Sequence, residues 1–328
     1  MKSLVLRLSA ITLFVGLATV AAAQLPGNVT PEAYDKEMKS LLEQATLAKL
    51  TGTPQPIVPL TPDWQLGMIS WAAMDREGVL YLLQRGKAAD PVVVVDRSGR
   101  VVRSWGSGRY SMPHSIRIDP QGNVWTTDAR TSTVTKFAPD GKVLLEIAVG
   151  GVPEGCGTPS APNPFCGTTD VAFGKDGHVF VADGYRNARV LEFAADGAKI
   201  REWSTATPGT AMFARAHSIA VGDDGVVYVA DRENARIQRF SAEGKLLGEW
   251  GRLGRPFALA MASDGLWVAS LPVVEPYNLG NLIKVDLQTG KPLERASLPG
   301  VHGLYAGRDA VVITPGVEGR PLVFRRNP

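Results

Sequence analysis

The chain has 328 residues, of which 45% are hydrophobic, so it can bury a large core as one all-β domain. Its formal net charge of +3 is spread over interspersed basic and acidic residues. No basic stripe with interleaved aromatic side chains is present, so we expect no nucleic-acid partner.

The first 23 residues have the composition of a secretory signal peptide. Lys2 and Arg7 give a positively charged n-region, residues 8–20 form an apolar h-region, and alanines at 21–23 form a small-residue cleavage site. The uncharged run over 8–23 is shorter than the ~20 residues of a membrane helix. We expect export to the periplasm or the extracellular space, without membrane attachment after cleavage. An uncleaved anchor is the alternative.

Residues 24–60 are predicted to form a helix and an extended linker rather than a second domain. Thr30 can cap the helix, Pro31 suits its first position, and residues 32–50 carry apolar side chains at helical spacing. Gly52 and a proline-rich stretch then end the helix.

Residues 61–328 contain six copies of a four-stranded unit. Each copy has a short apolar strand, a turn and a second strand. In the first five copies a third and fourth strand follow, joined by a tight turn that is mostly Asp-Gly, Ser-Gly or Glu-Gly. Turn glycines at 78, 122, 177, 225 and 265 recur every 40 to 55 residues. This period predicts a six-bladed β-propeller. The last unit lacks a fourth strand, and we expect residues 55–60 to supply it, because propellers leave no open edge.

Three of the four histidines occupy one position of the repeat. His114, His217 and His302 open the first strand of units two, four and six. The aligned residues of the other units are Ser70, Thr169 and Phe257. In a closed ring, alternate units stand about 120° apart and their equivalent positions converge on the axis. A lone histidine in a repeat is usually a packing or turn residue, but the strict alternation favours a metal site.

Zinc is the metal that we expect at three neutral imidazoles. Catalytic zinc sites use three protein ligands and keep a fourth position for water or substrate, whereas structural sites use four ligands. The sequence offers no fourth ligand at the histidine position of the repeat. This predicts that one coordination position of the zinc is open.

Three further residues follow second strands and should share the rim with the histidines. Arg85 and Arg232 occupy equivalent positions in units one and four, and two guanidiniums facing across a metal suit a carboxylate substrate. Tyr185 is a candidate general base. Each of the three has an alternative interpretation as a surface turn residue. The repeated Asp128, Asp183 and Asp231 are expected to brace turns.

Cys156 and Cys166 lie in a loop rich in proline and glycine. In an exported protein, such a pair favours a disulfide over a metal or redox site, and no CxxC motif is present.

Two segments resemble the peptidyl-α-hydroxyglycine α-amidating lyases, which are NHL-type six-bladed propellers. They are FCGTTDVAFGKDGHVFVADGYRNARV at 165–190 and AHSIAVGDDGVVYVADRENARIQRF at 216–240. The resemblance implies zinc on His114, His217 and His302, and Tyr185 as the base. It also implies two active-site arginines, Arg85 and Arg232. The family reaction cleaves the C–N bond of an α-hydroxyglycine into glyoxylate and an amide.

The chain departs from the family pattern at three positions. Arg186 replaces a cysteine that follows the tyrosine, so Cys166 is left to pair with Cys156. Gly300 replaces a methionine of the pocket wall. Gly303 replaces an acidic calcium ligand, so the resemblance implies Ca²⁺ only through backbone carbonyls near residues 72 and 116.

The leading hypothesis is an exported zinc lyase, monomeric, acting on a small carboxylate-bearing or peptidyl substrate. One alternative is a non-enzymatic NHL-type binding propeller for a protein or glycan. A gluconolactonase-like hydrolase is another, although its fold uses carboxylate-rich calcium sites and acidic residues are missing from the converging layer.

Overall fold

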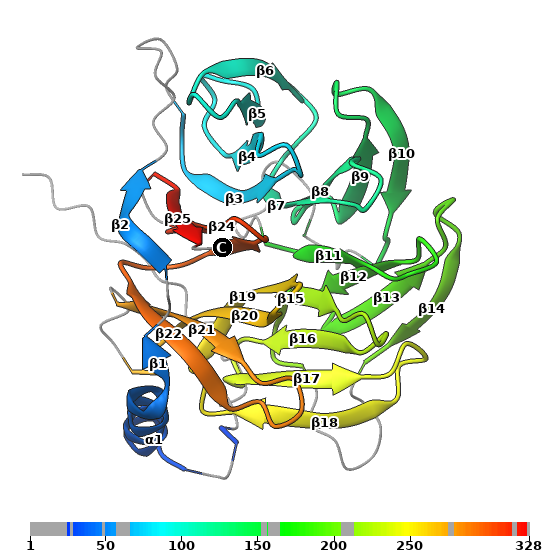
Figure 1. Ribbon diagram of the computed structural model, residues 1–328. Coiled ribbons are helices and arrows are strands. Elements are labelled where there is room, and N and C mark those ends of the chain that lie inside the picture. The colour runs from blue at the N-terminus through cyan, green and yellow to red at the C-terminus, as the bar shows by residue number, and fades with distance from the viewer. Residues whose placement is uncertain are drawn as a thin grey trace, which may run out of the picture.

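Six antiparallel sheets lie around a common axis as the blades of a β-propeller in the computed structural model (Figure 1). The expected all-β, six-bladed fold with one short N-terminal helix is therefore confirmed. The structure describes residues 25–26, 29–47, 50–56, 66–151, 156, 165–204, 213–274, 279–316 and 320–326. The signal segment predicted over 1–23 lies outside these residues.

Each blade is built from consecutive strands, with the first strand nearest the axis. Blade one contains β3 (Ile69–Met74), β4 (Leu80–Gln84), β5 (Val92–Val95) and β6 (Val101–Trp105). Blade two contains β7 (Pro113–Ile118), β8 (Val124–Asp128), β9 (Thr133–Phe137) and β10 (Val143–Ala148). Blade three contains β11 (Asp170–Phe173), β12 (Val179–Asp183), β13 (Arg189–Phe193) and β14 (Lys199–Trp203).

The remaining blades follow the same order. Blade four contains β15 (Ala216–Val221), β16 (Val227–Asp231), β17 (Arg236–Phe240) and β18 (Leu246–Gly251). Blade five contains β19 (Arg255–Ala262), β20 (Gly265–Leu271), β21 (Gly280–Val285) and β22 (Pro292–Leu298). Blade six contains β23 (Gly303–Ala306), β24 (Ala310–Thr314) and β25 (Leu322–Arg326).

Burial along the strands explains their sequence patterns. Second strands such as β4, β12 and β24 are buried along their whole length, and their sequences are near-continuous apolar runs. Outer strands such as β10 and β14 expose most of their residues to solvent and carry charged side chains. The core therefore lies between neighbouring blades rather than at the centre of the ring.

Tryptophans at the ends of fourth strands join one blade to the next. The Trp105 ring lies against Gly141 in the hairpin between β9 and β10, where an added Cβ would lie 2.8 Å from the ring. Gly141 also has φ +92°, which disfavours any other residue. The same contact joins Trp203 to Gly244 and Trp250 to Gly290. The recurring fourth-strand tryptophans and hairpin glycines of the repeat thus form contacts between neighbouring blades.

The N-terminal helix α1 (Pro31–Gln44) packs on the outside of the ring. Thr30 caps it by accepting a hydrogen bond from the Ala33 N–H, and the Tyr34 hydroxyl donates to the Ala235 carbonyl at 2.6 Å. The helix ends at Gln44 rather than at residue 50 as expected. The chain turns extended at Ala45 because β1 (Thr46–Leu47) then pairs in parallel with β22.

The chain before the propeller also supplies the fourth strand of blade six. Strand β2 (Leu50–Pro56) pairs antiparallel with β25, with Gln55 opposite Val323. This strand begins before the stretch 55–60 that we expected to fill the gap, and residues 57–60 lie outside the described part. Pairing with β2 covers the edge of β25, which removes an aggregation-prone edge.

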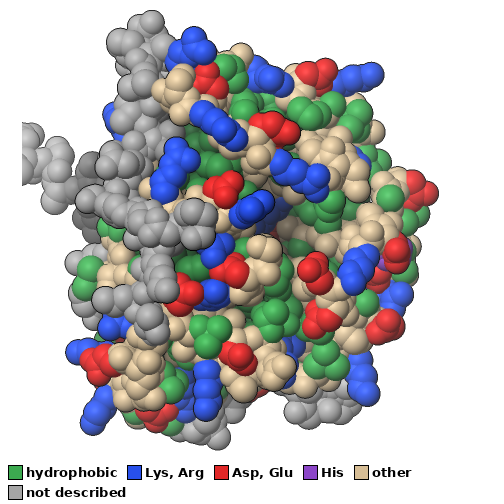
Figure 2. Space-filling model, viewed as in Figure 1, with side chains coloured by type: hydrophobic (Ala, Val, Ile, Leu, Met, Phe, Trp, Pro, Cys, Tyr) green, Lys and Arg blue, Asp and Glu red, His purple; other side chains and the backbone are tan. Residues whose placement is uncertain are grey.

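Basic and acidic side chains are interspersed over the face shown in Figure 2, and several basic ones border the hollow at its centre. Among the described residues, no helix is long and apolar enough to cross a membrane.

Candidate metal centre

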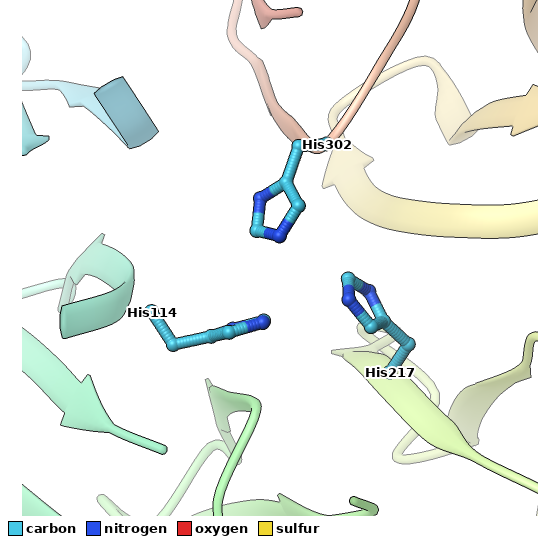
Figure 3. A group of neighbouring side chains, drawn as sticks. All are labelled: His114, His217 and His302. Carbon is cyan, nitrogen blue, oxygen red and sulfur yellow. The ribbon is translucent and has the colours of Figure 1, made fainter. Parts of the chain in front are cut away.

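The three histidines of the repeat point toward one another across the axis (Figure 3). His114 lies in β7, His217 lies in β15, and His302 directly precedes β23. Their ring centroids are 4.9, 4.9 and 5.2 Å apart, and one nitrogen of each lies within 4.8 Å of the others. All three residues are buried. They form a group that could hold a metal ion.

Each imidazole is oriented by the blade that follows it in the ring. The Nδ1 atoms bond to backbone carbonyl oxygens, His114 to Thr169 (2.6 Å), His217 to Phe257 (2.6 Å) and His302 to Ser70 (2.9 Å). A carbonyl only accepts, so Nδ1 carries the proton and Nε2 presents its lone pair. The three acceptors are the residues that the sequence alignment of the units places at the histidine position in units three, five and one. Residues aligned in the sequence are therefore neighbours around the axis of the structure.

Burial keeps the three imidazoles neutral. It lowers the pKa of His302 to about 3, with a further contribution from the charge of Arg85. Burial also lowers the pKa of His114 and His217 well below the ordinary value, and the charges of neighbouring histidines and arginines add to this effect. Three neutral, buried Nε2 lone pairs at one point are the donor set that a divalent transition metal prefers.

Tyr185 places its hydroxyl at the histidine group. It follows β12, and its oxygen lies 2.8 Å from Nε2 of His114 and 3.3 Å from Nε2 of His217. Its ring contacts the Phe165 ring at 4.8 Å, and the Arg215 guanidinium lies 5.3 Å from the ring centroid. The phenol therefore faces the point on which the imidazole nitrogens converge.

Arg85 lies beside the histidines at the end of blade one. Its Nε donates to the Pro113 carbonyl and its Nη2 to the Ser70 hydroxyl, both at 2.9 Å. Its guanidinium also lies 5.5 Å from the Phe165 ring centroid. None of the salt bridges among the described residues involves Arg85, and burial lowers its pKa. It is thus a cation without a carboxylate partner in the described part of the chain.

Arg232 belongs to what we call the Glu233 cluster, which consists of Glu233, Arg215, Arg232 and Arg255. Glu233 Oε1 accepts from Arg232 Nη2 at 2.7 Å and from Arg215 Nη1 at 2.9 Å, while Oε2 pairs with Arg255. Burial raises the pKa of Glu233, but the charges of the three guanidiniums outweigh it, and the pKa falls to about 2. The cluster keeps a net positive charge next to the site.

Phe257 connects this cluster to the histidines. Its ring lies 5.3 Å from the His217 ring, and the Arg232 guanidinium lies 4.5 Å from its centroid. Sequence reasoning placed Arg85, Tyr185 and Arg232 here but missed the rest of the surrounding wall. The missed residues are Phe165, Arg215, Glu233, Arg255 and Phe257. Arg215 stands two residues before His217 and Glu233 directly after Arg232, which was the available signal.

The repeated aspartates brace turns, as expected. Asp128 accepts hydrogen bonds from four backbone N–H groups, at residues 111, 112, 130 and 131. Asp183 and Asp231 accept from side chains of their own blades, including Arg189 and Arg236.

The Arg117 side chain reaches across the propeller axis, in the layer of side chains next to that of the histidines. Its guanidinium is bidentate to Asp170 and donates to the carbonyls of Leu259 and Leu304. Asp170 is fully buried. Arg117 and Asp170 therefore form an internal ion pair, in which the guanidinium compensates the charge of the carboxylate.

A disulfide joins Cys156 to Cys166, with the Cα atoms 5.6 Å apart. The predicted pairing is thus confirmed. Cys166 follows Phe165 directly, so the disulfide tethers the segment whose ring contacts Tyr185.

Two segments of the chain match the NHL repeat model, residues 110–137 and 213–240. They contain the first three strands of blades two and four, with His114 and His217. A solved structure titled streptogramin B lyase has a TM-score of 0.58 at 16% identity, covering 84% of this chain and 98% of that one. This likeness shows the propeller fold alone.

Curated relatives share more sequence. A Caenorhabditis elegans protein named a probable peptidyl-alpha-hydroxyglycine alpha-amidating lyase is 29% identical, over 87% of this chain and 90% of its own length. The Xenopus laevis peptidyl-glycine alpha-amidating monooxygenase B is 31% identical over 76% of this chain. This chain spans only 33% of that longer protein. The expected resemblance is confirmed: this NHL-repeat propeller is similar to the peptidyl-alpha-hydroxyglycine alpha-amidating lyases.

Proposed function

We propose that the chain is a zinc-dependent carbon–nitrogen lyase that converts an N-acyl-α-hydroxyglycine into an amide and glyoxylate. The observation that carries the proposal is the Tyr185 hydroxyl, which lies 2.8 Å and 3.3 Å from the Nε2 atoms of two converging histidines. A phenol at such a centre, flanked by guanidiniums, suits proton removal from a hydroxyl on a carboxylate-bearing carbon.

His114, His217 and His302 would hold the zinc, since each presents a neutral Nε2 and is oriented by a backbone carbonyl. When bound there, zinc supplies a Lewis acid for the substrate hydroxyl. Calcium is not part of the proposal, because Gly303 offers no carboxylate and Arg117 already places a cation on the axis.

The protein's own groups would perform the remaining steps. Arg85 and Arg232 hold the substrate carboxylate, because both present guanidinium N–H groups beside the histidines. Tyr185 takes the hydroxyl proton while the C–N bond breaks and the carbonyl of glyoxylate forms. The leaving nitrogen takes up a proton, which completes the amide.

We further propose that the protein is exported through a signal peptide over residues 1–23 and acts as a monomer. The Cys156–Cys166 disulfide supports an oxidising compartment.

Glyoxylate release from a small panel of N-acyl-α-hydroxyglycines tests the proposal, with metal analysis of the same purified preparation. We expect turnover and one zinc per chain. Metal-free protein that is inert with every substrate would refute the lyase and favour a binding propeller, whereas calcium without zinc would favour a lactonase.

A further inference from the structure

Ser70 lies in β3, at the position of unit one that aligns with the histidines of the even-numbered units. It is fully buried, and its hydroxyl makes two hydrogen bonds, to the His114 carbonyl at 2.6 Å and to Arg85 Nη2 at 2.9 Å. A buried hydroxyl without partners is costly, and these two bonds offset that cost. Ser70 therefore connects an arginine of the candidate site directly to a residue of the metal centre.

The chemistry of the two partners fixes the direction of these hydrogen bonds. A carbonyl only accepts, and a guanidinium only donates. The Ser70 hydroxyl therefore donates its proton to the His114 carbonyl and accepts an N–H of Arg85. A side chain without a hydroxyl at this position would leave that guanidinium N–H without its acceptor.

The backbone of Ser70 orients a second histidine. Its carbonyl accepts from His302 Nδ1 and from the Thr314 hydroxyl, both at 2.9 Å. Any residue supplies a carbonyl, so these bonds survive a change of side chain, whereas the contact with Arg85 needs the hydroxyl. A substitution at Ser70 therefore tests the hydroxyl without removing the acceptor of His302.

The aligned residues of the other odd-numbered units lack this connection to an arginine. The Thr169 hydroxyl donates to the carbonyls of Ala216 and Ala182, at 2.7 and 3.0 Å, and Phe257 has no hydroxyl. Neither side chain accepts a hydrogen bond from an arginine in the described part of the chain. The contact thus belongs to the blade that carries Arg85 and is not a general feature of the repeat.

Ser70 holds Arg85 without offsetting its charge, because a hydroxyl is neutral. The Pro113 carbonyl, which accepts from Arg85 Nε at 2.9 Å, is neutral as well. Arg232, by contrast, pairs with Glu233 at 2.7 Å, and that carboxylate offsets part of its charge. A guanidinium binds a carboxylate through two parallel N–H groups only when its plane is correctly oriented, and fixing the plane beforehand lowers the entropic cost of binding.

We infer that Ser70 is a positioning residue, whose hydroxyl holds the Arg85 guanidinium in the orientation that binds the substrate carboxylate. The inference rests on the proposed function for the identity of that carboxylate. It assigns to Ser70 a role in substrate binding, so loss of the hydroxyl should raise KM and leave kcat within about twofold of its original value.

Binding of two inert ligands tests this role without catalysis. N-acetylglycine carries the carboxylate, N-acetylglycinamide replaces it by a neutral amide, and neither has the hydroxyl that the reaction requires. By calorimetry we expect wild type to prefer the carboxylate. Ser70→Ala should bind N-acetylglycine about 10-fold more weakly and the amide unchanged, as the loss of one hydrogen bond to a charged group gives. Equal affinity of the two proteins for N-acetylglycine, or no carboxylate preference in wild type, would overturn the inference.

A double-mutant cycle shows whether Ser70 acts through Arg85. Arg85→Gln should lose the carboxylate preference, and adding Ser70→Ala to it should cause no further loss, because the effects of residues in contact are not additive. Ser70→Thr keeps the hydroxyl, and threonine already occupies the aligned position 169, so this variant should retain the preference. Additive losses in the cycle, or a loss in Ser70→Thr equal to that in Ser70→Ala, would contradict the role of the hydroxyl.

Ser218→Ala is the matched control. Ser218 is equally buried, and its hydroxyl donates to Asp170 at 2.6 Å and accepts from the Leu259 N–H at 3.0 Å, in the layer of Arg117. This variant should lower the thermal unfolding temperature as Ser70→Ala does, but leave the affinity for N-acetylglycine unchanged. An equal loss of affinity in both variants would show a general structural effect and overturn the assignment. Ser70→Cys replaces the hydroxyl by a weak acceptor and carries the expectation of Ser70→Ala should that variant fail to fold.

Activity separates this inference from the proposed function. A carboxylate affinity that falls in Ser70→Ala, in a protein that releases no glyoxylate from N-acetyl-α-hydroxyglycine, would refute the lyase but keep the role of Ser70. Glyoxylate release by Ser70→Ala with the KM of wild type would keep the lyase and refute the role of Ser70.

Discussion

Replacing Tyr185 by phenylalanine removes a single oxygen atom from the candidate site. The ring contact with Phe165 at 4.8 Å and the Arg215 contact at 5.3 Å do not need the hydroxyl. The backbone N–H of Tyr185 still donates to the Gly167 carbonyl at 3.3 Å. The histidines keep their Nδ1 bonds to backbone carbonyls, so the variant should fold and retain its metal.

The expected loss lies in the chemical step. The phenolic oxygen is 2.8 Å from His114 Nε2, within reach of a hydroxyl proton held at the same point. General acid–base groups typically contribute about 100- to 10,000-fold, which corresponds to a rise in the activation barrier of about 2.7 to 5.5 kcal/mol. Because the guanidiniums rather than Tyr185 would hold the carboxylate, kcat should fall while KM stays close to its original value.

The assay is glyoxylate formation from an N-acyl-α-hydroxyglycine, with zinc content and thermal unfolding measured on the same preparations. Tyr305→Phe is the matched control, because Tyr305 lines the cavity at the other end of the axis, with Arg117. Full activity in Tyr185→Phe would show that Tyr185 is not the base. An equal loss in both variants would show a structural effect.

Four further predictions concern the metal, the substrate carboxylate, the disulfide and the helix. His217→Ala should lose stoichiometric zinc by metal analysis, and zinc persisting at one per chain would refute the three-histidine site. Arg232→Ala should raise KM by about 10- to 100-fold through the lost charged hydrogen bonds, and an unchanged KM would exclude a carboxylate contact. The mass of the exported protein should rise by that of two hydrogen atoms on reduction, as the Cys156–Cys166 disulfide requires; two alkylated thiols in unreduced protein would contradict export to an oxidising compartment. Burial raises the pKa of Tyr34 above its ordinary value of 10.0, so its stabilising contribution is complete below that pH and is lost as the pH rises toward the folded-state pKa. Denaturation midpoints should therefore fall between about pH 9 and 12 more steeply for wild type than for Tyr34→Phe; parallel curves would refute this.

The local sequence pattern was sufficient to predict the propeller, because this fold repeats one supersecondary unit with short connections. Turn residues and strand periodicity are local properties, and their recurrence identified the blades. Closure of the ring then follows from the repeat, so the alignment of His114, His217 and His302 predicted their convergence. The hydrogen bonds from these histidines to Thr169, Phe257 and Ser70 show that the aligned positions are neighbours in space.

The end of the helix was decided by tertiary contacts. Residues 45–50 retain helical spacing in the sequence, but pairing of β1 with β22 draws the chain into an extended conformation. Helical propensity is weak beside the hydrogen bonds and burial that a neighbouring strand offers.

The surroundings of the site likewise required the tertiary structure. Phe165, Arg215 and Arg255 lie outside the repeated second-strand ends that identified Arg85, Tyr185 and Arg232. Their proximity depends on how side chains from different blades turn toward the axis. Charge pairing is also not visible in the sequence: three arginines share Glu233, whereas Arg117 pairs with Asp170 across the axis. Periodicity determines which positions meet, but the number of cations that share one carboxylate depends on side-chain direction and burial, which only the folded ring provides.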